Sequence, residues 1–71
     1  MTSGSVVIPV YNSAEILPEL IARLGPVLAR ELDWFEVILV NDGSRDRSWA
    51  VIEELAARHD WVTGIDLMRN Y

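Results

Sequence analysis

The stretch Val37–Asp46, VILVNDGSRD, decides the fold of this chain, because an apolar β-type run stops abruptly at polar, turn-forming residues. The stretch Val6–Asn12, VVIPVYN, is built in the same way nearer the amino terminus. A segment with helical periodicity follows each of them. In an open parallel sheet the carboxyl ends of the strands share one edge, where such folds bind their ligands. We therefore predict that the two polar ends meet and form one site.

The alternation of apolar runs with segments of 3.6-residue period predicts a βαβαβ order. Strands are expected near residues 5–10, 36–41 and 62–67, and helices near residues 13–31 and 46–59. The predicted fold class is α/β, a parallel three-stranded unit with right-handed crossovers. The first run is so uniformly apolar that it is typical of a strand buried on both faces.

The first helix has clear predicted features. Asn12 or Ser13 is expected to cap it, and Glu15 suits the positive end of its dipole. Pro26 lacks an N–H and clashes with the preceding turn, so a kink or a brief break is expected at Gly25-Pro26. The predicted apolar face consists of Ile16, Leu17, Leu20, Ile21, Leu24, Val27 and Leu28.

Composition excludes several classes of protein. The chain has 71 residues, a net charge of −5 and no cysteine, so it has no disulfide framework and no thiolate metal site. Six basic against eleven acidic residues give no basic footprint, and we expect no nucleic-acid partner. No apolar stretch approaches the roughly 20 residues of a membrane span, and no secretory signal begins the chain.

The two motifs, IPVYN at Ile8–Asn12 and VNDGSRD at Val40–Asp46, resemble the start of the inverting family-2 glycosyltransferases. They are most similar to the dolichol-phosphate mannose synthase-like and undecaprenyl-phosphate glycosyltransferase branch. The resemblance extends through Leu67–Tyr71, LMRNY. It implies that residues 1–71 are the amino-terminal, nucleotide-binding portion of an incomplete catalytic domain with a Rossmann-like GT-A fold.

The resemblance also implies an activity for the complete protein. The complete enzyme is expected to move a sugar from a uridine or guanosine diphosphate sugar to an acceptor, a polyprenyl phosphate, in cell-wall or surface-glycan synthesis. Its expected location is cytoplasmic, at the inner face of the cytoplasmic membrane. A divalent cation, Mg²⁺ or Mn²⁺, is expected there, but its Asp-x-Asp ligands are not in this chain, for which no catalytic and no metal residue is assigned.

Tyr11 and Pro9 are the candidate site residues of the first motif. Tyr11 offers an aromatic plate for a nucleobase, although on position alone it could merely cover the end of the sheet. The resemblance places the matching tyrosine at the nucleotide site. Pro9 cannot donate a ladder hydrogen bond, which indicates either a strand end or a neighbouring carbonyl left free for a ligand.

The remaining candidate nucleotide-binding residues are carboxylates. Asp42 could accept hydrogen bonds from a base imide or from ribose hydroxyls, or it could form an Asx-turn or helix cap. Asp46 could cap the second helix or contact the ligand. Glu15 matches an acidic position of the family, but Ile16 stands where the family has asparagine. Pro9, Tyr11 and Asp42 are predicted to line one pocket, with Glu15 and Asp46 at its rim.

Two other function classes stay open at this stage. One is another mononucleotide-binding domain, but the chain contains neither G-x-G-x-x-G nor a P-loop motif. The other is a non-catalytic interaction module or receiver-like domain, against which the first strand ends in Tyr11-Asn12 rather than in acidic residues. The chain alone is expected to be inactive in sugar transfer and to self-associate, because three parallel strands leave two unpaired edges.

Overall fold

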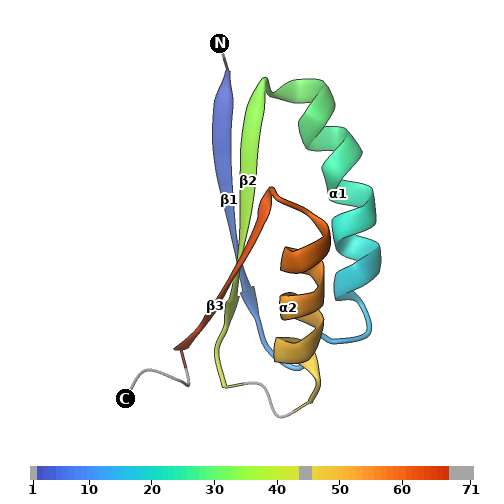
Figure 1. Cartoon of the computed structure of the whole chain (residues 1–71), viewed down its shortest axis with the longest axis vertical. Coiled ribbons are helices and arrows are strands. Elements are labelled where there is room, and N and C mark those ends of the chain that lie inside the picture. The colour runs from blue at the N-terminus through green and yellow to red at the C-terminus, as the bar shows by residue number, and fades with distance from the viewer. Residues whose placement is uncertain (1, 44–45, 68–71) are drawn as a thin grey trace.

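The computed structural model describes residues 2–43 and 46–67 and confirms the predicted βαβαβ order (Figure 1). The elements are β1 (Ser3–Val10), α1 (Leu17–Glu31), β2 (Trp34–Asn41), α2 (Ser48–Arg58) and β3 (Val62–Asp66).

Strands β1 and β2 begin earlier than predicted. The carbonyl oxygen of Thr2 accepts the amides of Asp33 and Trp34, and the Asp33 carboxylate accepts the amide of Thr2 at 2.8 Å. These hydrogen bonds extend the pairing of β1 with β2 to its first residues. The predicted third strand extended to residue 67, whereas β3 ends at Asp66.

The described strands form one parallel sheet in the order β1-β2-β3. Each helix connects neighbouring strands, and both connections run in the same direction across the sheet. Since such connections are right-handed as a rule, both helices are expected on the same face of the sheet. Figure 1 shows α1 and α2 packed side by side on one side of the sheet.

The core lies between these helices and the sheet. Its buried apolar residues come from all five elements and are Val10, Leu17, Ile21, Val37, Leu39, Ile52, Leu55 and Val62. Of the predicted apolar face of α1, Ile16 and Val27 are exposed instead, because they lie at the margin of the stripe that faces the sheet.

The prediction that the first strand is buried on both faces is wrong. Exposure alternates along β1, since side chains of a strand point to opposite faces. Val7 is 61% exposed on the face that the helices leave open, together with Ile65 of β3. In the described part of the chain no element covers this face, which leaves apolar side chains in contact with solvent.

The predicted side-chain cap of α1 is also wrong. The N-cap residue is Ile16, which makes no side-chain capping hydrogen bond, and Pro18 lies in the first turn. The backbone carbonyl of Ser13, rather than its hydroxyl, accepts the amides of Ile16 and Leu17, both at 3.2 Å. Glu15 therefore precedes the helix, and Glu19 is the acidic residue of the first turn.

Helix α1 runs through Pro26 without the brief break considered above. The pyrrolidine ring is on the exposed side, where water can satisfy the carbonyl left without an N–H donor. The neighbouring Gly25 is buried, and a Cβ there would lie 3.0 Å from the Trp61 ring. Gly25 thus allows close packing of α1 on Trp61. In the described ranges, neither helix is long and apolar enough to cross a membrane.

Candidate functional site

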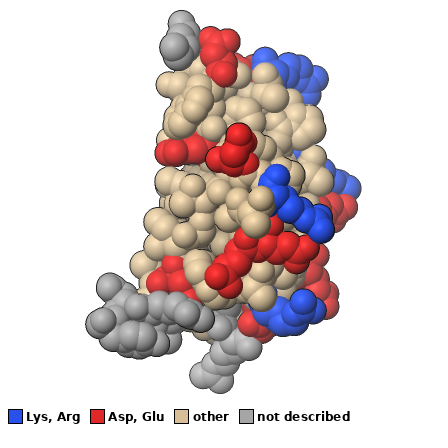
Figure 2. Space-filling view, viewed as in Figure 1, with Lys and Arg blue, Asp and Glu red and all other residues tan. Residues whose placement is uncertain are grey.

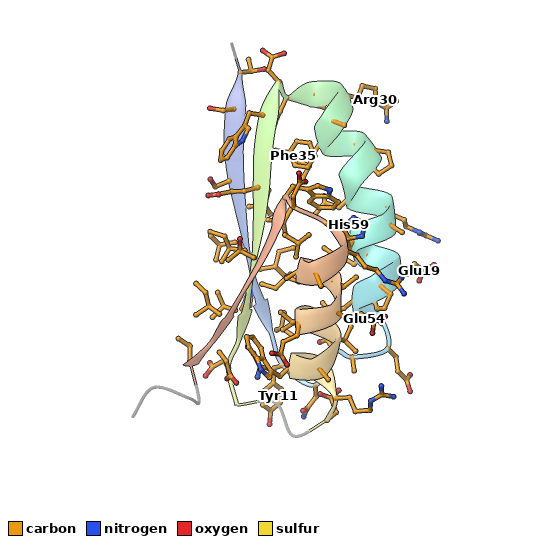
Figure 3. The ribbon with its side chains drawn as sticks, viewed as in Figure 1. Tyr11, Glu19, Arg30, Phe35, Glu54 and His59 are labelled. Atoms are coloured by element: carbon orange, nitrogen blue, oxygen red, sulfur yellow. The ribbon has the colours of Figure 1, made fainter. Side chains whose placement is uncertain are left out.

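The carboxyl ends of β1 and β2 meet as the two motifs predict. Val10 pairs with Asn41 in the sheet register, and the amide of Asp42 donates to the carbonyl oxygen of Val10 at 3.1 Å. Tyr11 and Asp42, the residues directly after this pair, are therefore neighbours at one edge. Both are exposed, and Figure 3 shows Tyr11 at the end of the molecule where α2 begins.

Each of the two strand ends turns through a residue with positive φ. Asn12 has a φ of 46°, in the left-handed region that asparagine enters more readily than most residues. Gly43 has a φ of 72°, where any side chain would be strained. These turns let the polar side chains leave the sheet at its edge, and the hairpin that an Asp-Gly pair can signal does not form.

Pro9 lies within β1 and pairs with Val40, so the strand has not ended at this residue. Since the carbonyl of Val10 accepts from β2, the backbone groups of Pro9 point away from β2. Within the described sheet, β1 is an edge strand, and an outward position is where proline costs no ladder hydrogen bond.

Asp46 is held by hydrogen bonds from two segments. Its Oδ1 accepts the amide of Ser48 at 2.9 Å and the Ser48 hydroxyl, and its Oδ2 accepts the amide of Ala14 at 3.2 Å. Ser48 in turn accepts the amide of Ser13 at 2.8 Å. Asp46 directly precedes Arg47, the N-cap residue of α2, and its carboxylate accepts the amide of Ser48, the first residue of the helix.

These hydrogen bonds lower the pKa of Asp46 from its usual value of 3.8, the Ser48 hydroxyl most strongly. A depressed pKa means that the interactions are complete above the ordinary value and are lost as pH falls through the lower one. We expect the Ala14 and Ser48 amide shifts to titrate together in an NMR pH series, with a midpoint below 3.8. Asp46→Asn should abolish this titration, and a midpoint at or above the ordinary value would contradict it.

Glu15 is exposed and lies beside Asp46, where they border two shallow hollows. The hollow between α1 and α2 has a volume of about 380 Å³, and the other has about 310 Å³. Neither is lined by Pro9, Tyr11 or Asp42, and a pocket common to those three residues stays a prediction. A further hollow, of about 300 Å³ around Trp34 and Trp61, lies at the amino-terminal end of β2.

Three polar residues of this edge were not identified from the sequence. Asn41 is buried, and its Nδ2 donates to Oδ1 of Asp66 at 3.3 Å, while its Oδ1 has no partner among the described residues. Ser48 is fully buried under the site. The pairing of Asn41 with Asp66 in the parallel register could have indicated their proximity, whereas no sequence signal marks Ser48.

The acidic side chains of the described residues form no metal cluster. Residues 2–43 and 46–67 contain no group of three or more potential metal ligands. On the face that Figure 2 shows, acidic and basic side chains are interspersed. Pairs such as Arg23 with Glu19 and Arg58 with Glu54, each one helical turn apart, account for part of this pattern.

Comparison with known proteins agrees with this arrangement. Residues 5–71 match the family described as glycosyl transferase family 2. The chain is 47% identical to the undecaprenyl-phosphate 4-deoxy-4-formamido-L-arabinose transferase of Shewanella sediminis and 44% identical to that of Pseudomonas fluorescens. Each alignment covers 94% of this chain and 20% of the relative, so the chain spans about a fifth of the length of these proteins. The chain belongs to glycosyl transferase family 2.

Proposed function

We propose that residues 1–71 are the amino-terminal, donor-nucleotide-binding portion of a glycosyltransferase catalytic domain. The hydrogen bond from the Asp42 amide to the Val10 carbonyl carries this proposal, because it makes Tyr11 and Asp42 neighbours at the ligand-binding edge of a parallel sheet. The complete enzyme transfers a sugar from a nucleotide diphosphate sugar to a polyprenyl phosphate. The names of its relatives, which act on undecaprenyl phosphate, support this acceptor.

Tyr11 and Asp42 supply complementary contacts to a nucleoside. The exposed Tyr11 ring provides a flat surface on which a base can stack. The Asp42 carboxylate can accept hydrogen bonds from the imide N–H of uracil, from the N1–H of guanine, or from ribose hydroxyls. It repels a diphosphate, so the sugar and phosphates lie away from it. Glu15 and Asp46 form the rim, and Pro9 supports the strand end.

The transfer breaks the bond from the anomeric carbon of the sugar to the donor diphosphate and forms one to an acceptor phosphate oxygen. The divalent cation expected of the complete enzyme does not fit the described residues of this chain, which offer no cluster of ligands for it. We therefore assign the chain no step in the cleavage itself. Its contribution is to bind and orient the nucleotide. A polyprenyl phosphate acceptor supports a location of the complete protein at the inner face of the cytoplasmic membrane.

Nucleotide titration tests this function. We expect the chain to bind UDP or GDP more tightly than ADP or CDP, with chemical-shift changes at Tyr11 and Asp42 in NMR spectra. Tyr11→Ala should weaken binding about 5- to 150-fold, because base stacking contributes about 1–3 kcal/mol. Asp42→Ala should weaken it about 10- to 150-fold, because a hydrogen bond to a charged group contributes about 1.5–3 kcal/mol.

Conservative variants provide the controls. Tyr11→Phe keeps the ring and should retain most of the affinity, and Asp42→Asn keeps one acceptor oxygen and should fall between wild type and Asp42→Ala. Unchanged affinity in both alanine variants would show that the base binds elsewhere. Equal affinity for all four nucleotides would argue against base recognition by Asp42.

The open face of the sheet leads to a second expectation, self-association of this chain. Val7 and Ile65 are 61% and 43% exposed on this face, and contiguous exposed apolar surface favours association. Sedimentation analysis should give an average mass that rises with concentration. The double substitution Val7→Lys and Ile65→Lys should lower it, whereas Ala22→Lys on the exposed side of α1 should not. A wild-type mass equal to that of the monomer at every concentration would refute this expectation.

A further inference from the structure

Two hydrogen bonds join the segment after β1 to the start of α2, and two more connect Asp46 with Ser48 within that start. The Asp46 carboxylate accepts the Ala14 amide through one oxygen, and the Ser48 amide and hydroxyl through the other. The Ser48 oxygen accepts the Ser13 amide at 2.8 Å. We call Ser13, Ala14, Asp46 and Ser48 the loop clamp. It links segments that are 32 to 35 residues apart in the sequence.

Within the loop clamp, the Ser48 hydroxyl acts both as a hydrogen-bond donor and as an acceptor. A serine hydroxyl has one hydrogen to donate, and that of Ser48 goes to Asp46 while its oxygen accepts from Ser13. Ser48 is fully buried, so water cannot replace a lost partner there without rearrangement. Each carboxylate oxygen of Asp46 accepts from a different segment. The backbone N–H groups can only donate, and the ionised Asp46 carboxylate, which can only accept, fixes the direction of the hydrogen bond from the Ser48 hydroxyl.

The clamp continues to Tyr11. The Ser13 hydroxyl donates to the carbonyl oxygen of Tyr11 at 2.8 Å, and only Asn12, in its left-handed conformation, lies between these residues. A chain of hydrogen bonds thus runs from Asp46 through Ser48 and Ser13 to the backbone of Tyr11. On this geometry, the position of the exposed Tyr11 ring depends on α2 rather than on its own strand alone.

We infer that Asp46 and Ser48 are positioning residues, which hold the loop after β1 against the start of α2 and thereby orient Tyr11 for the nucleotide. This inference rests on the proposed nucleotide-binding function. In this inference Asp46 acts on the nucleotide site indirectly, through the hydrogen bonds that it accepts from Ala14 and Ser48. Ser48, which no sequence motif marks, becomes a determinant of the site.

Two charged side chains of opposite sign lie near Asp46, the residue that we infer to position the loop after β1. Glu15 of the loop and Arg47 of the start of α2 line the same hollow, one of each sign. Protonation of Asp46 would place a hydrogen on an oxygen that faces the N–H group of Ala14 or Ser48. Two hydrogens would then face each other, and that hydrogen bond would be lost. A carboxyl group with the ordinary pKa of 3.8 is already ionised at neutral pH, and the lowered pKa of Asp46 extends the pH range of the intact clamp to more acidic values.

Two substitutions remove, one at a time, the two hydrogen bonds that join the loop after β1 to the start of α2. Asp46→Asn keeps an acceptor oxygen for Ser48 but can offer only an NH₂ group to the Ala14 amide. Ser48→Ala removes the acceptor of the Ser13 amide and leaves the Ala14 contact. Glu53→Gln, an exposed change on α2 with the same loss of charge, is the matched control for the first, and Ser3→Ala at the far end of β1 is the control for the second.

Amide hydrogen exchange and nucleotide affinity, measured on the 71-residue chain by NMR, test the inference. Exchange at Ala14 should accelerate about tenfold in Asp46→Asn, and exchange at Ser13 by a similar factor in Ser48→Ala, as expected for loss of about one hydrogen bond. The Tyr11 amide resonance should shift in both variants and in neither control. UDP or GDP should bind about 3- to 10-fold more weakly to both variants.

A double-variant comparison distinguishes positioning from direct contact. In a Tyr11→Ala background, Asp46→Asn should cause no further loss of affinity, since the side chain that it orients is gone. A full additional loss would show that Asp46 contacts the nucleotide itself and would overturn the inference. Unchanged exchange at Ser13 and Ala14, or an unshifted Tyr11 amide, would also overturn it. A wild-type chain that binds no nucleotide would instead refute the proposed function, while the exchange and Tyr11 data would still decide the clamp.

Discussion

Replacing Ile52 by alanine is expected to lower the free energy of unfolding by about 2–5 kcal/mol, the range for truncating a buried isoleucine. Ile52 is fully buried where α2 packs on the sheet, and few core residues can move to fill the space. A domain this small has only a few kcal/mol of stability in total, so the variant should be largely unfolded in water. Urea unfolding followed by tryptophan fluorescence measures the change.

The control for this experiment is Ile16→Ala. It removes the same atoms from a side chain that is 59% exposed, and the expected change is within about 0.5 kcal/mol. A loss below about 1 kcal/mol for Ile52→Ala would mean that α2 is not packed on the sheet as described here.

Gly64→Ala is the second substitution with a large expected effect, a loss of about 1–3 kcal/mol from overpacking. A Cβ at this position of β3 would collide with Cγ2 of Ile52 and lie 3.3 Å from the Trp49 ring. Both neighbours belong to α2, so the helix would have to move off the sheet. Urea unfolding again provides the measurement, with Gly4→Ala as a milder case, since a Cβ there meets a flexible Leu32 side chain at 3.1 Å.

Combining the two substitutions tests the contact itself. Ile52→Ala removes the atom that the new methyl group would meet, and the methyl group partly fills the resulting cavity. The double variant should therefore be more stable than the sum of the two single losses predicts, by about 0.5–3 kcal/mol. Strict additivity would show that Gly64 and Ile52 are not in contact.

The sequence predicted the elements and the meeting of the two strand ends because those depend on strong, local patterns. The apolar runs that end at Asn41-Asp42 and Tyr11-Asn12 specify strands, and the helical segments after them leave only a parallel arrangement. Once the strands are parallel, the carboxyl edge follows from topology. Tyr11 and Asp42 are neighbours for that reason alone, whereas their contact with a nucleotide stays a prediction.

The details that were missed depend on tertiary structure. β1 is apolar enough for burial on both faces, yet no described element covers one of them, which only the three-dimensional arrangement shows. Ser13 was expected to cap α1 through its side chain, but its amide and hydroxyl are engaged by Ser48 and Tyr11. The Ala14 amide, which the Asp46 carboxylate also accepts, lies in a segment distant in the sequence, so local capping rules could not identify this partner.

The outward orientation of Pro9 limits how another strand can join this sheet. Along β1 the outward backbone groups belong to Ser3, Ser5, Val7 and Pro9, and only the first three can donate an N–H. A strand added at this edge can form a regular ladder up to Val7, after which the next donor is missing. A further strand at this edge would therefore be held less firmly next to Tyr11 than along the rest of β1.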